Sequence, residues 1–189
     1  MIEKHKVPPY IDTWSGRKIN LLDPDPDSIN IDDIANSLSM QCRFTGHTSH
    51  FYSVAEHSVL VSELVDPEYA LEGLLHDAAE AYLSDIASPL KQLLPEYYYI
   101  EDKFAKAIAE KFNIIYPYPN NIKKADNTAL LHEANQLLVT KGKDWAYLYL
   151  NSLQDVELPR LACLNPEQAR HRFLDRFFEI PNKISTRCD

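Results

Sequence analysis

Apolar residues at helical spacing recur along this chain, whereas glycine, which the tight turns of β-proteins often require, is scarce. The 189 residues include only four glycines. After Asn30, a residue type favoured at helix N-caps, apolar side chains fall at Ile31, Ile34, Ala35 and Leu38. These positions lie on one face of a helix. Because similar spacings follow in several later segments, the sequence predicts an all-α fold.

Capping residues and prolines predict where the other helices begin. Ser53 followed by Glu56 has the form of a capping box, and Asp66 and Asn165 each precede a proline that can occupy the first helical turn. Pro95 precedes apolar residues that repeat in steps of four. We expect helices over about 30–38, 53–65, 66–82, 95–112, 121–139, 145–153 and 165–178.

The chain is expected to form one domain over residues 1–189, with a motif-bearing core at about residues 30–140. The first 28 residues contain four prolines and Gly16 and predict an irregular N-terminal arm, in which a short hairpin around Gly16 is an alternative. Residues 43–52 break the helical spacing and predict a loop. No repeat, low-complexity tract or linker divides the remaining sequence. The sequence therefore indicates a single-domain helical bundle.

Composition excludes several classes of protein. Hydrophobic residues make up 45% and charged residues 25%, which argues against disorder as the main state. No apolar run approaches the roughly 18–20 residues of a membrane span, and the start lacks an apolar signal core. A net charge of −9 argues against binding along a nucleic-acid backbone. Three scattered cysteines without CxxC spacing indicate neither disulfides nor a cysteine zinc site, so we expect a cytoplasmic protein.

Four polar side chains with metal-binding chemistry lie on helix faces that are otherwise apolar. His76 and Asp77 interrupt the apolar stretch 71–81, where a buried, unpaired carboxylate would cost several kcal/mol. His57 shares a helix face with valine and leucine side chains. Asp126 is likewise flanked by apolar residues on its helix. Each of these groups therefore needs a partner, and a metal ion is one that all four could share.

Two imidazoles and two carboxylates from three helices would form a mixed nitrogen and oxygen site with open positions for water. Such a site suits Mn, Fe, Co, Ni or Zn. For any single one of these residues, the alternative is a structural role, such as a core histidine bonded to a backbone carbonyl. The presence of all four favours the metal site.

The order of these four residues resembles that of a known family. His57, His76-Asp77 and Asp126 form the H…HD…D pattern of the HD-domain metal-dependent phosphohydrolases, an all-helical superfamily. A longer match over roughly residues 43–135 resembles the bacterial HD-type deoxynucleoside 5′-monophosphatases and the phage dATP triphosphohydrolases. The resemblance implies an HD-type helical bundle. Its motifs are Arg43, Glu56-His57-Ser58, His76-Asp77-Ala78-Ala79-Glu80, Asp85 and Pro89-Leu90-Lys91.

The resemblance implies a role for each matching position. The four histidine and aspartate residues would bind the metal, which we expect to be Zn, Co, Mn, Fe or Ni, and a second ion such as Mg at the phosphates is an open alternative. Glu80 would hold or activate the attacking water, and Asp85 would assist it. Arg43 and Lys91 would bind phosphate. Elementary chemistry supports these roles. Glu80 lies one helical turn from His76, so its carboxylate can approach water at the same metal and act as a general base. The cations Arg43 and Lys91 would stabilise the negative charge that grows on the phosphoryl oxygens.

One position departs from the family pattern. The 5′-monophosphatases carry Arg-Trp before the first histidine, whereas this chain has Arg43-Phe44, one residue closer to His57. We therefore assign Phe44 to substrate binding but leave sugar and base selectivity open. Tyr82 and the run Tyr97–Tyr99 could also stack on a base, although aromatic residues at helical spacing more often pack in a core.

The sequence thus predicts a metal-dependent phosphohydrolase that cleaves phosphate esters or anhydrides of (deoxy)nucleotides. Both a 5′-monophosphatase and a dNTP (dATP-like) triphosphohydrolase remain open. The alternatives are hydrolysis of another phosphoester, such as an alarmone or a cyclic nucleotide, and a non-catalytic HD binding module, which loss of metal ligands would mark. We expect a homo-oligomer that takes a small nucleotide, binds neither long nucleic acid nor membrane, and works in the cytoplasm of a bacterium or of a phage-infected host cell.

Overall fold

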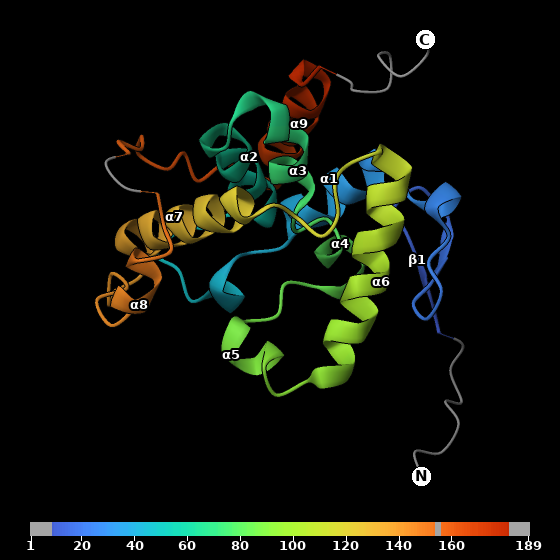
Figure 1. The fold of residues 1–189 in the computed structure, drawn as a ribbon, viewed down its shortest axis with the longest axis horizontal. Helices are drawn as coiled ribbons and strands as arrows, with labels where there is room; N and C mark the ends of the chain where they lie inside the picture. The colour runs from blue at the N-terminus through green and yellow to red at the C-terminus, as the bar shows by residue number, and fades with distance from the viewer. Residues whose placement is uncertain (1–8, 154–155, 182–189) are drawn as a thin grey trace.

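The computed structural model describes residues 9–153 and 156–181 and shows a mostly helical fold (Figure 1). In this part of the chain, short 3₁₀ helices lie at Pro26–Ser28, Phe44–Gly46 and Pro67–Tyr69. The α-helices are α1 (Ile31–Met40), α2 (Val54–Leu64), α3 (Ala70–Leu75), α4 (Glu80–Leu83), α5 (Ser88–Lys91), α6 (Pro95–Phe112), α7 (Asn120–Leu137), α8 (Ala146–Tyr149) and α9 (Pro166–Glu179). The spacing of apolar residues therefore predicts the main type of secondary structure correctly.

Helix α2 lies inside the bundle, where it packs against α1, α3, α7 and α9 (Figure 1). Its residues 54–62 are all buried, and a helix enclosed on all sides must satisfy its polar side chains internally. The hydroxyl of Ser58 donates to the carbonyl of Val54, and the hydroxyl of Ser62 donates to that of Val59. His57 lies in the same enclosed helix, so it too requires partners.

The helix starts follow the predicted capping residues. The Ser53 hydroxyl accepts a hydrogen bond from the Glu56 N–H at 3.1 Å, and the Glu56 carboxylate accepts one from the Ser53 N–H at 3.4 Å. Asn165 and Gln168 form a second capping box at the start of α9. The structure confirms the helices predicted over about 30–38, 53–65, 95–112, 121–139 and 165–178.

The prediction of one continuous helix over about 66–82 is wrong, because this segment forms several shorter helices separated by turns. Helix α3 ends at Leu75, four turn residues follow, and α4 begins at Glu80. The N–H groups of Ala78 and Glu80 bond to carbonyls three residues back, as in a 3₁₀ helix. Apolar spacing does not distinguish such tight turns from an α-helix. The helix predicted after Trp145 is likewise shorter and is limited to α8.

A small two-stranded sheet corrects the prediction of an irregular arm in an all-α fold. Strand β1 (Tyr10–Asp12) pairs antiparallel with β2 (Lys18–Asn20). Gly16 lies in the connecting turn with a φ of +80°, a conformation that glycine adopts without strain. The N–H and the hydroxyl of Ser15 both donate to the Asp33 carboxylate, at 2.7 Å each, and fasten this turn to α1. The alternative of a short hairpin around Gly16 is therefore confirmed.

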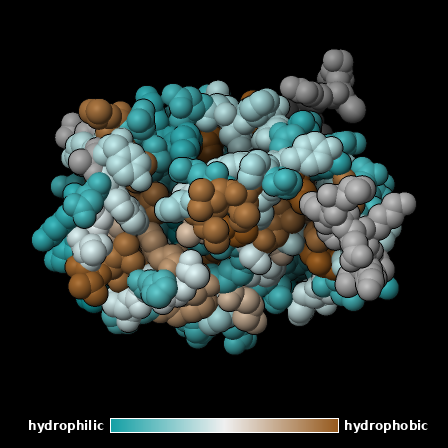
Figure 2. Space-filling view, turned by 90° about the horizontal axis from the view of Figure 1, so that it is seen from below, coloured by the Kyte–Doolittle hydropathy of each residue, from teal (hydrophilic) through white to brown (hydrophobic). Residues whose placement is uncertain are grey.

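Hydrophobic side chains gather on the face that is seen from below (Figure 2). Helix α5, which lies near the lower edge of Figure 1, and the residues after it carry the exposed side chains of Leu90, Leu93 and Leu94. Among the helices of residues 9–153 and 156–181, none combines the length and the apolar character that a membrane crossing requires.

Candidate metal centre

Four side chains from three parts of the chain meet beside α2. His57 comes from α2, His76 and Asp77 from the turn after α3, and Asp126 from α7. The Asp77 Oδ2 atom lies 3.5 Å from His57 Nε2 and 3.3 Å from His76 Nε2. The Asp126 Oδ1 atom lies 3.4 Å from His57 Nε2, and the ligand atoms of Asp126 and the two histidines all lie within 4.8 Å of one another. The structure thus brings the four predicted ligands together.

The two histidines present unpartnered Nε2 atoms to this point. Both atoms are buried, and neither makes a hydrogen bond within the described residues. The opposite ring nitrogens are engaged, because His57 Nδ1 donates to Glu133 Oε1 at 2.7 Å and His76 Nδ1 donates to the Gly73 carbonyl at 2.8 Å. Since carboxylate and carbonyl oxygens only accept, Nδ1 carries a hydrogen in each ring, so a ring without a second proton has its lone pair on Nε2. Hydrogen bonds of this kind orient metal-binding histidines in proteins.

The spacing and chemistry of these atoms fit a divalent metal ion. Adjacent ligand atoms at about 2.0–2.2 Å from a shared ion lie about 2.8–3.6 Å apart, which agrees with the separations of 3.3, 3.4 and 3.5 Å. A set of two imidazoles and two carboxylates suits transition metals. His57, His76 and Asp126 therefore form a possible metal-binding group, with Asp77 beside both histidines.

A buried carboxylate that sequence reasoning missed, Glu133, supports His57. Its side chain is fully buried on α7, and it accepts hydrogen bonds from His57 Nδ1 and, at 3.0 Å, from Arg43 Nε. Glu133 lies two helical turns after Asp126, so both carboxylates occupy one face of α7. That spacing is the sequence signal that could have identified Glu133.

The charges around the centre shift the pKa values of its groups. Burial and the positive charge of Arg43 oppose protonation of His57, but Glu133 and Asp126 outweigh these effects and raise the pKa of His57 to about 10. Burial alone would raise the pKa of Asp77, but His76 and His57 bring it well below its usual range. The same two histidines lower the pKa of Asp126 against the effect of its burial. Both aspartates are therefore ionised and supply the negative charge that a cation requires.

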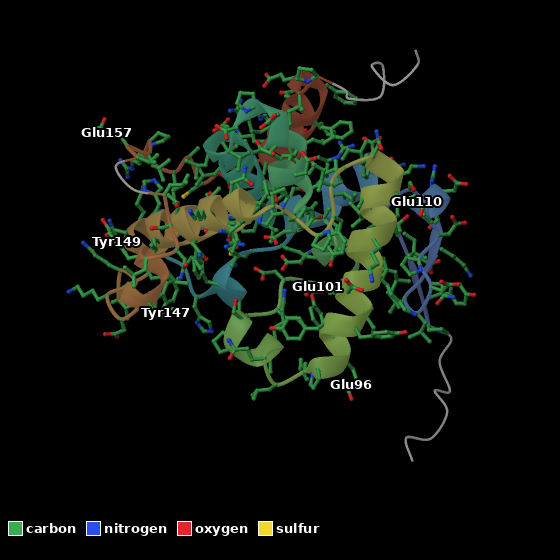
Figure 3. The ribbon with its side chains drawn as sticks, viewed as in Figure 1. Glu96, Glu101, Glu110, Tyr147, Tyr149 and Glu157 are labelled. Atoms are coloured by element: carbon green, nitrogen blue, oxygen red, sulfur yellow. The ribbon has the colours of Figure 1, made fainter. Side chains whose placement is uncertain are left out.

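Glu80 lies at the start of α4 and is 5% exposed. Its Oε2 atom has no hydrogen-bond partner within the described residues, and Lys91 Nζ donates to its Oε1 atom at 3.4 Å. Burial, together with the negative charges of Asp77 and Asp85, raises the pKa of Glu80 well above its usual range. Lys91 also donates at 2.7 Å to Glu101 on α6 (Figure 3). Lys91, which was predicted to bind phosphate, is therefore held by two carboxylates in this structure.

Arg43 connects the metal-ligand residues with a second group of predicted site residues. Its Nη1 atom lies 3.7 Å from Asp77 Oδ2, and its Cζ atom lies 5.6 Å from the centre of the Phe44 ring. Asp85 lines the same pocket as Arg43 and Phe44. Burial raises the pKa of the Asp85 carboxyl, and Arg43 opposes this rise. The structure thus places Arg43, Phe44 and Asp85 together at one edge of the centre.

Two pockets adjoin the centre. We call the first the acidic pocket; it has a volume of about 490 Å³, and its acidic, basic and histidine side chains are His76, Asp77, Glu80, Glu101, Asp102, Lys123 and Asp126. We call the second the aromatic pocket; it has a volume of about 380 Å³, and its lining includes Arg43, Phe44, His47, Asp85, Trp145 and Tyr147. The contact between Arg43 and Asp77 joins the two pockets. Three of the four predicted ligands thus line the acidic pocket, whereas the aromatic pocket adjoins the centre through Arg43.

Two of the tyrosines considered for base stacking have other roles. Tyr82 is buried and stacks on Phe104, with the ring centres 5.2 Å apart. The hydroxyl of Tyr97 donates to a backbone carbonyl at 2.9 Å. The stacked pair in the aromatic pocket consists instead of Phe44 and Trp145, whose ring centres are 6.2 Å apart.

Comparisons with known proteins show relatives along most of the chain. The chain matches no protein-family model. It is 42% identical to the uncharacterized protein YfdR of Escherichia coli K12 over 171 residues, which are 90% of this chain and 95% of YfdR. It is 38% identical to an uncharacterized protein of Rhodobacter capsulatus over 137 residues, which are 65% of this chain and 70% of that protein. Because the first match extends over nearly the whole length of both proteins, the chain belongs to the same family as Escherichia coli YfdR.

Proposed function

We propose that this protein is a metal-dependent phosphohydrolase that acts on (deoxy)nucleotides, either as a 5′-monophosphatase or as a triphosphohydrolase. The observation that carries the proposal is the pair of buried, unpartnered Nε2 atoms of His57 and His76, which face the carboxylates of Asp77 and Asp126. In a purely structural core such nitrogen atoms would be paired with hydrogen-bonding groups. The resemblance to the HD-domain phosphohydrolases supports the same function from the order of the residues.

The four residues would hold a divalent ion such as Zn, Co, Mn, Fe or Ni. When bound, the ion would polarise a phosphoryl oxygen and lower the pKa of water at the site. His57 would bind through its Nε2 lone pair after that atom loses its proton, and Glu133 keeps Nε2 directed at the centre by accepting the hydrogen of Nδ1. The Gly73 carbonyl does the same for His76.

Glu80 would accept the proton of the attacking water. Its Oε2 atom is buried without a partner within the described residues, and the side chain lines the acidic pocket beside the metal ligands. Its raised pKa moves the carboxylate toward the range in which a general base is effective near neutral pH. Lys91, which donates to the other carboxylate oxygen, fixes the orientation of Glu80. Asp85 would assist from its place beside Arg43.

Arg43 would bind the phosphoryl group and stabilise the negative charge that grows on its oxygens. Although Arg43 is buried, its pKa is raised by Glu133 and Asp77, so the guanidinium remains charged. Glu133 uses the Nε hydrogen, which leaves the Nη groups as donors to a phosphate. A charged donor that is already in position requires little reorganisation during the reaction.

The test is the release of phosphate, pyrophosphate or triphosphate from a panel of ribonucleotides and deoxynucleotides with added Mn, Co, Zn or Mg. We expect metal-dependent release of one of these products and its loss in Asp126→Asn, which keeps the size of the side chain but removes its charge. His50→Asn is the matched control, because His50 is exposed and bonds to the neighbouring Ser49. Absence of all three products with every metal, or full activity of Asp126→Asn, would contradict the proposal.

A further inference from the structure

We propose that the aromatic pocket binds the base of the nucleotide, which stacks on Trp145 and Phe44 while the phosphate lies at the metal centre. This inference rests on the proposed function, because it assigns a binding site to the base of the same nucleotide substrate. It adds Trp145, which lies beyond the segment of roughly residues 43–135 that carries the sequence motif. The argument depends on the walls of the pocket, on the backbone that supports them, and on their distance from Arg43.

Phe44 and Trp145 form an aromatic wall of two nearly parallel rings. Their ring centres lie 6.2 Å apart, and their planes differ by only 22°. The rest of the lining is largely apolar and includes Pro89, Leu130, Leu138 and Leu148. A volume of about 380 Å³ lies within the range of small-molecule sites. Flat aromatic walls in a pocket of this size suit a planar heterocycle.

The backbone around Phe44 supports a role in binding. Phe44 and Thr45 both have a φ of 54°, in the left-handed region that bulky residues rarely adopt. Such strain is concentrated at functional sites, where the surrounding structure maintains it. Here the loop is held by the Arg43 N–H, which donates to the Tyr52 carbonyl at 2.9 Å, and by the Gly46 N–H, which donates to the Arg43 carbonyl at 3.1 Å. The strained residue thus keeps its ring beside Arg43.

A tight turn holds Trp145 against α7. Gly142 has a φ of +64°, and a Cβ atom added there would lie 3.1 Å from Ala134 Cβ and 3.4 Å from Trp145 Cε3. The Trp145 N–H donates to the Gly142 carbonyl at 2.9 Å. The next residues form α8, whose exposed Tyr147 also lines the pocket (Figure 3). The position of the indole is therefore set by close packing rather than by a free loop.

Arg43 joins the two halves of the proposed substrate site. Its Nη1 atom lies 3.7 Å from Asp77 Oδ2 at the metal centre, and its Cζ atom lies 5.6 Å from the centre of the Phe44 ring. The phosphate and the base of a nucleotide are separated by a single sugar. A phosphate held by Arg43 therefore leaves the base within reach of the stacked rings.

The acidic pocket is a less suitable place for the base. Among the described residues, five carboxylates line the acidic pocket, whereas the aromatic pocket is lined by one carboxylate, that of Asp85. Tyr116 and Tyr118 in the acidic pocket pack edge to face, with ring centres 5.3 Å apart and planes at 88°. The Tyr118 hydroxyl also donates to the Leu75 carbonyl at 3.2 Å. Because the Tyr116 and Tyr118 rings pack edge to face, they offer no pair of parallel faces to a base.

Stacking predicts a particular pattern of affinity. Every base has an aromatic face, so stacking supports binding without strong selection among bases. Purines present a larger face than pyrimidines, so we expect purine nucleotides to bind more tightly. A sugar phosphate without a base should bind only through the metal centre and Arg43.

Fluorescence of Trp145 provides a test that does not depend on turnover. The chain contains two tryptophans, so Trp14→Phe leaves Trp145 as the sole indole; Trp14 is 61% exposed and lies outside the aromatic pocket. The probes are deoxyadenosine monophosphate, deoxyadenosine and deoxyribose 5-phosphate, added to the protein with and without Zn. We expect saturable quenching by the two probes that carry a base and none by deoxyribose 5-phosphate.

Variants of the wall test the same inference through affinity. Trp145→Ala should weaken calorimetric binding of deoxyadenosine monophosphate roughly 5- to 150-fold, whereas Trp145→Phe should retain most of it. Tyr98→Ala is the matched control, because Tyr98 is a partly exposed aromatic residue that lines the acidic pocket. Circular dichroism verifies that each variant is folded, and the quenching of Trp145 remains informative if Trp145→Ala is not.

The outcomes separate this inference from the proposed function. Quenching by deoxyadenosine without hydrolysis of any nucleotide would support the base site and contradict the phosphohydrolase. Hydrolysis without quenching, with weaker binding in Tyr98→Ala and unchanged binding in Trp145→Ala, would overturn the base site and leave the phosphohydrolase in place. Absence of both quenching and hydrolysis would overturn both.

Discussion

Replacing Glu133 with glutamine removes a negative charge from the two hydrogen bonds that hold His57 and Arg43. The carboxylate accepts from His57 Nδ1 at 2.7 Å and from Arg43 Nε at 3.0 Å, and its side chain is fully buried. Glutamine has nearly the same shape but only one accepting oxygen. One of the two donors must therefore face the N–H₂ group of the new amide.

Two effects of known size follow from Glu133→Gln. A buried donor without a partner costs about 1–3 kcal/mol, and breaking a buried ion pair costs about 3–5 kcal/mol. Because Arg43 keeps Asp77 at 3.7 Å, we expect the free energy of unfolding to fall by an intermediate amount, about 2–4 kcal/mol. Loss of a hydrogen bond that orients a metal-binding histidine lowers metal affinity about 10- to 100-fold.

Two assays measure these effects separately. Urea unfolding of the metal-free protein gives the stability of Glu133→Gln, and chelator competition gives its affinity for zinc. Glu110→Gln is the matched control at an exposed position of α6 (Figure 3), where we expect a change within about 0.5 kcal/mol. Wild-type stability together with wild-type zinc affinity in Glu133→Gln would refute the role assigned to Glu133.

Three further predictions concern other parts of the site and its support. Glu80→Ala should retain zinc in equilibrium dialysis but lose about 10²- to 10⁴-fold in turnover, because the proton acceptor is removed; near wild-type turnover would exclude this role. In the metal-free protein, the pKa of His57 is raised from 6.5 to about 10. Protonated His57 therefore contributes fully to the free energy of unfolding below pH 6.5, and this contribution is lost as the pH rises toward 10. Urea unfolding across this range should show falling stability, and a rise would contradict the expectation. Gly73→Ala should destabilise the fold by about 1–3 kcal/mol, because a Cβ atom there would lie 3.0 Å from Ser62 Cα and 3.1 Å from a Val65 methyl group; an unchanged unfolding midpoint would show that α2 and α3 can separate without cost.

Helix ends were predictable because the groups that terminate a helix are close in sequence. Ser53 and Glu56 satisfy one another's backbone groups within a single turn, and the structure contains both bonds. The break after Leu75 was not predictable in the same way. Helical and 3₁₀ turns differ in which carbonyl each N–H reaches, whereas the spacing of apolar residues over one turn is nearly the same. This break gives His76 and Asp77 their positions beside α2.

His76 and Asp77 were predictable as candidate ligands because they interrupt an apolar stretch, whereas His57 and Asp126 were marked by apolar residues on the same helix face and by the H…HD…D pattern. Glu133 lies outside that pattern and its neighbours His132 and Asn135 are also polar, so only its spacing from Asp126 marks it. Trp145 carries no comparable local signal. Its stacking partner Phe44 belongs to a distant loop, and periodicity does not determine how two loops pack.

Titration of the metal-free protein with zinc, followed by elemental analysis after gel filtration, tests the metal centre most directly. The arrangement of His57, His76, Asp77 and Asp126 predicts one high-affinity zinc ion per chain in the wild-type protein and in His50→Asn. It predicts loss of that ion in His76→Ala and Asp126→Asn. Absence of zinc from the folded wild-type protein, or equal zinc content in His76→Ala and Asp126→Asn, would contradict the existence of this metal centre.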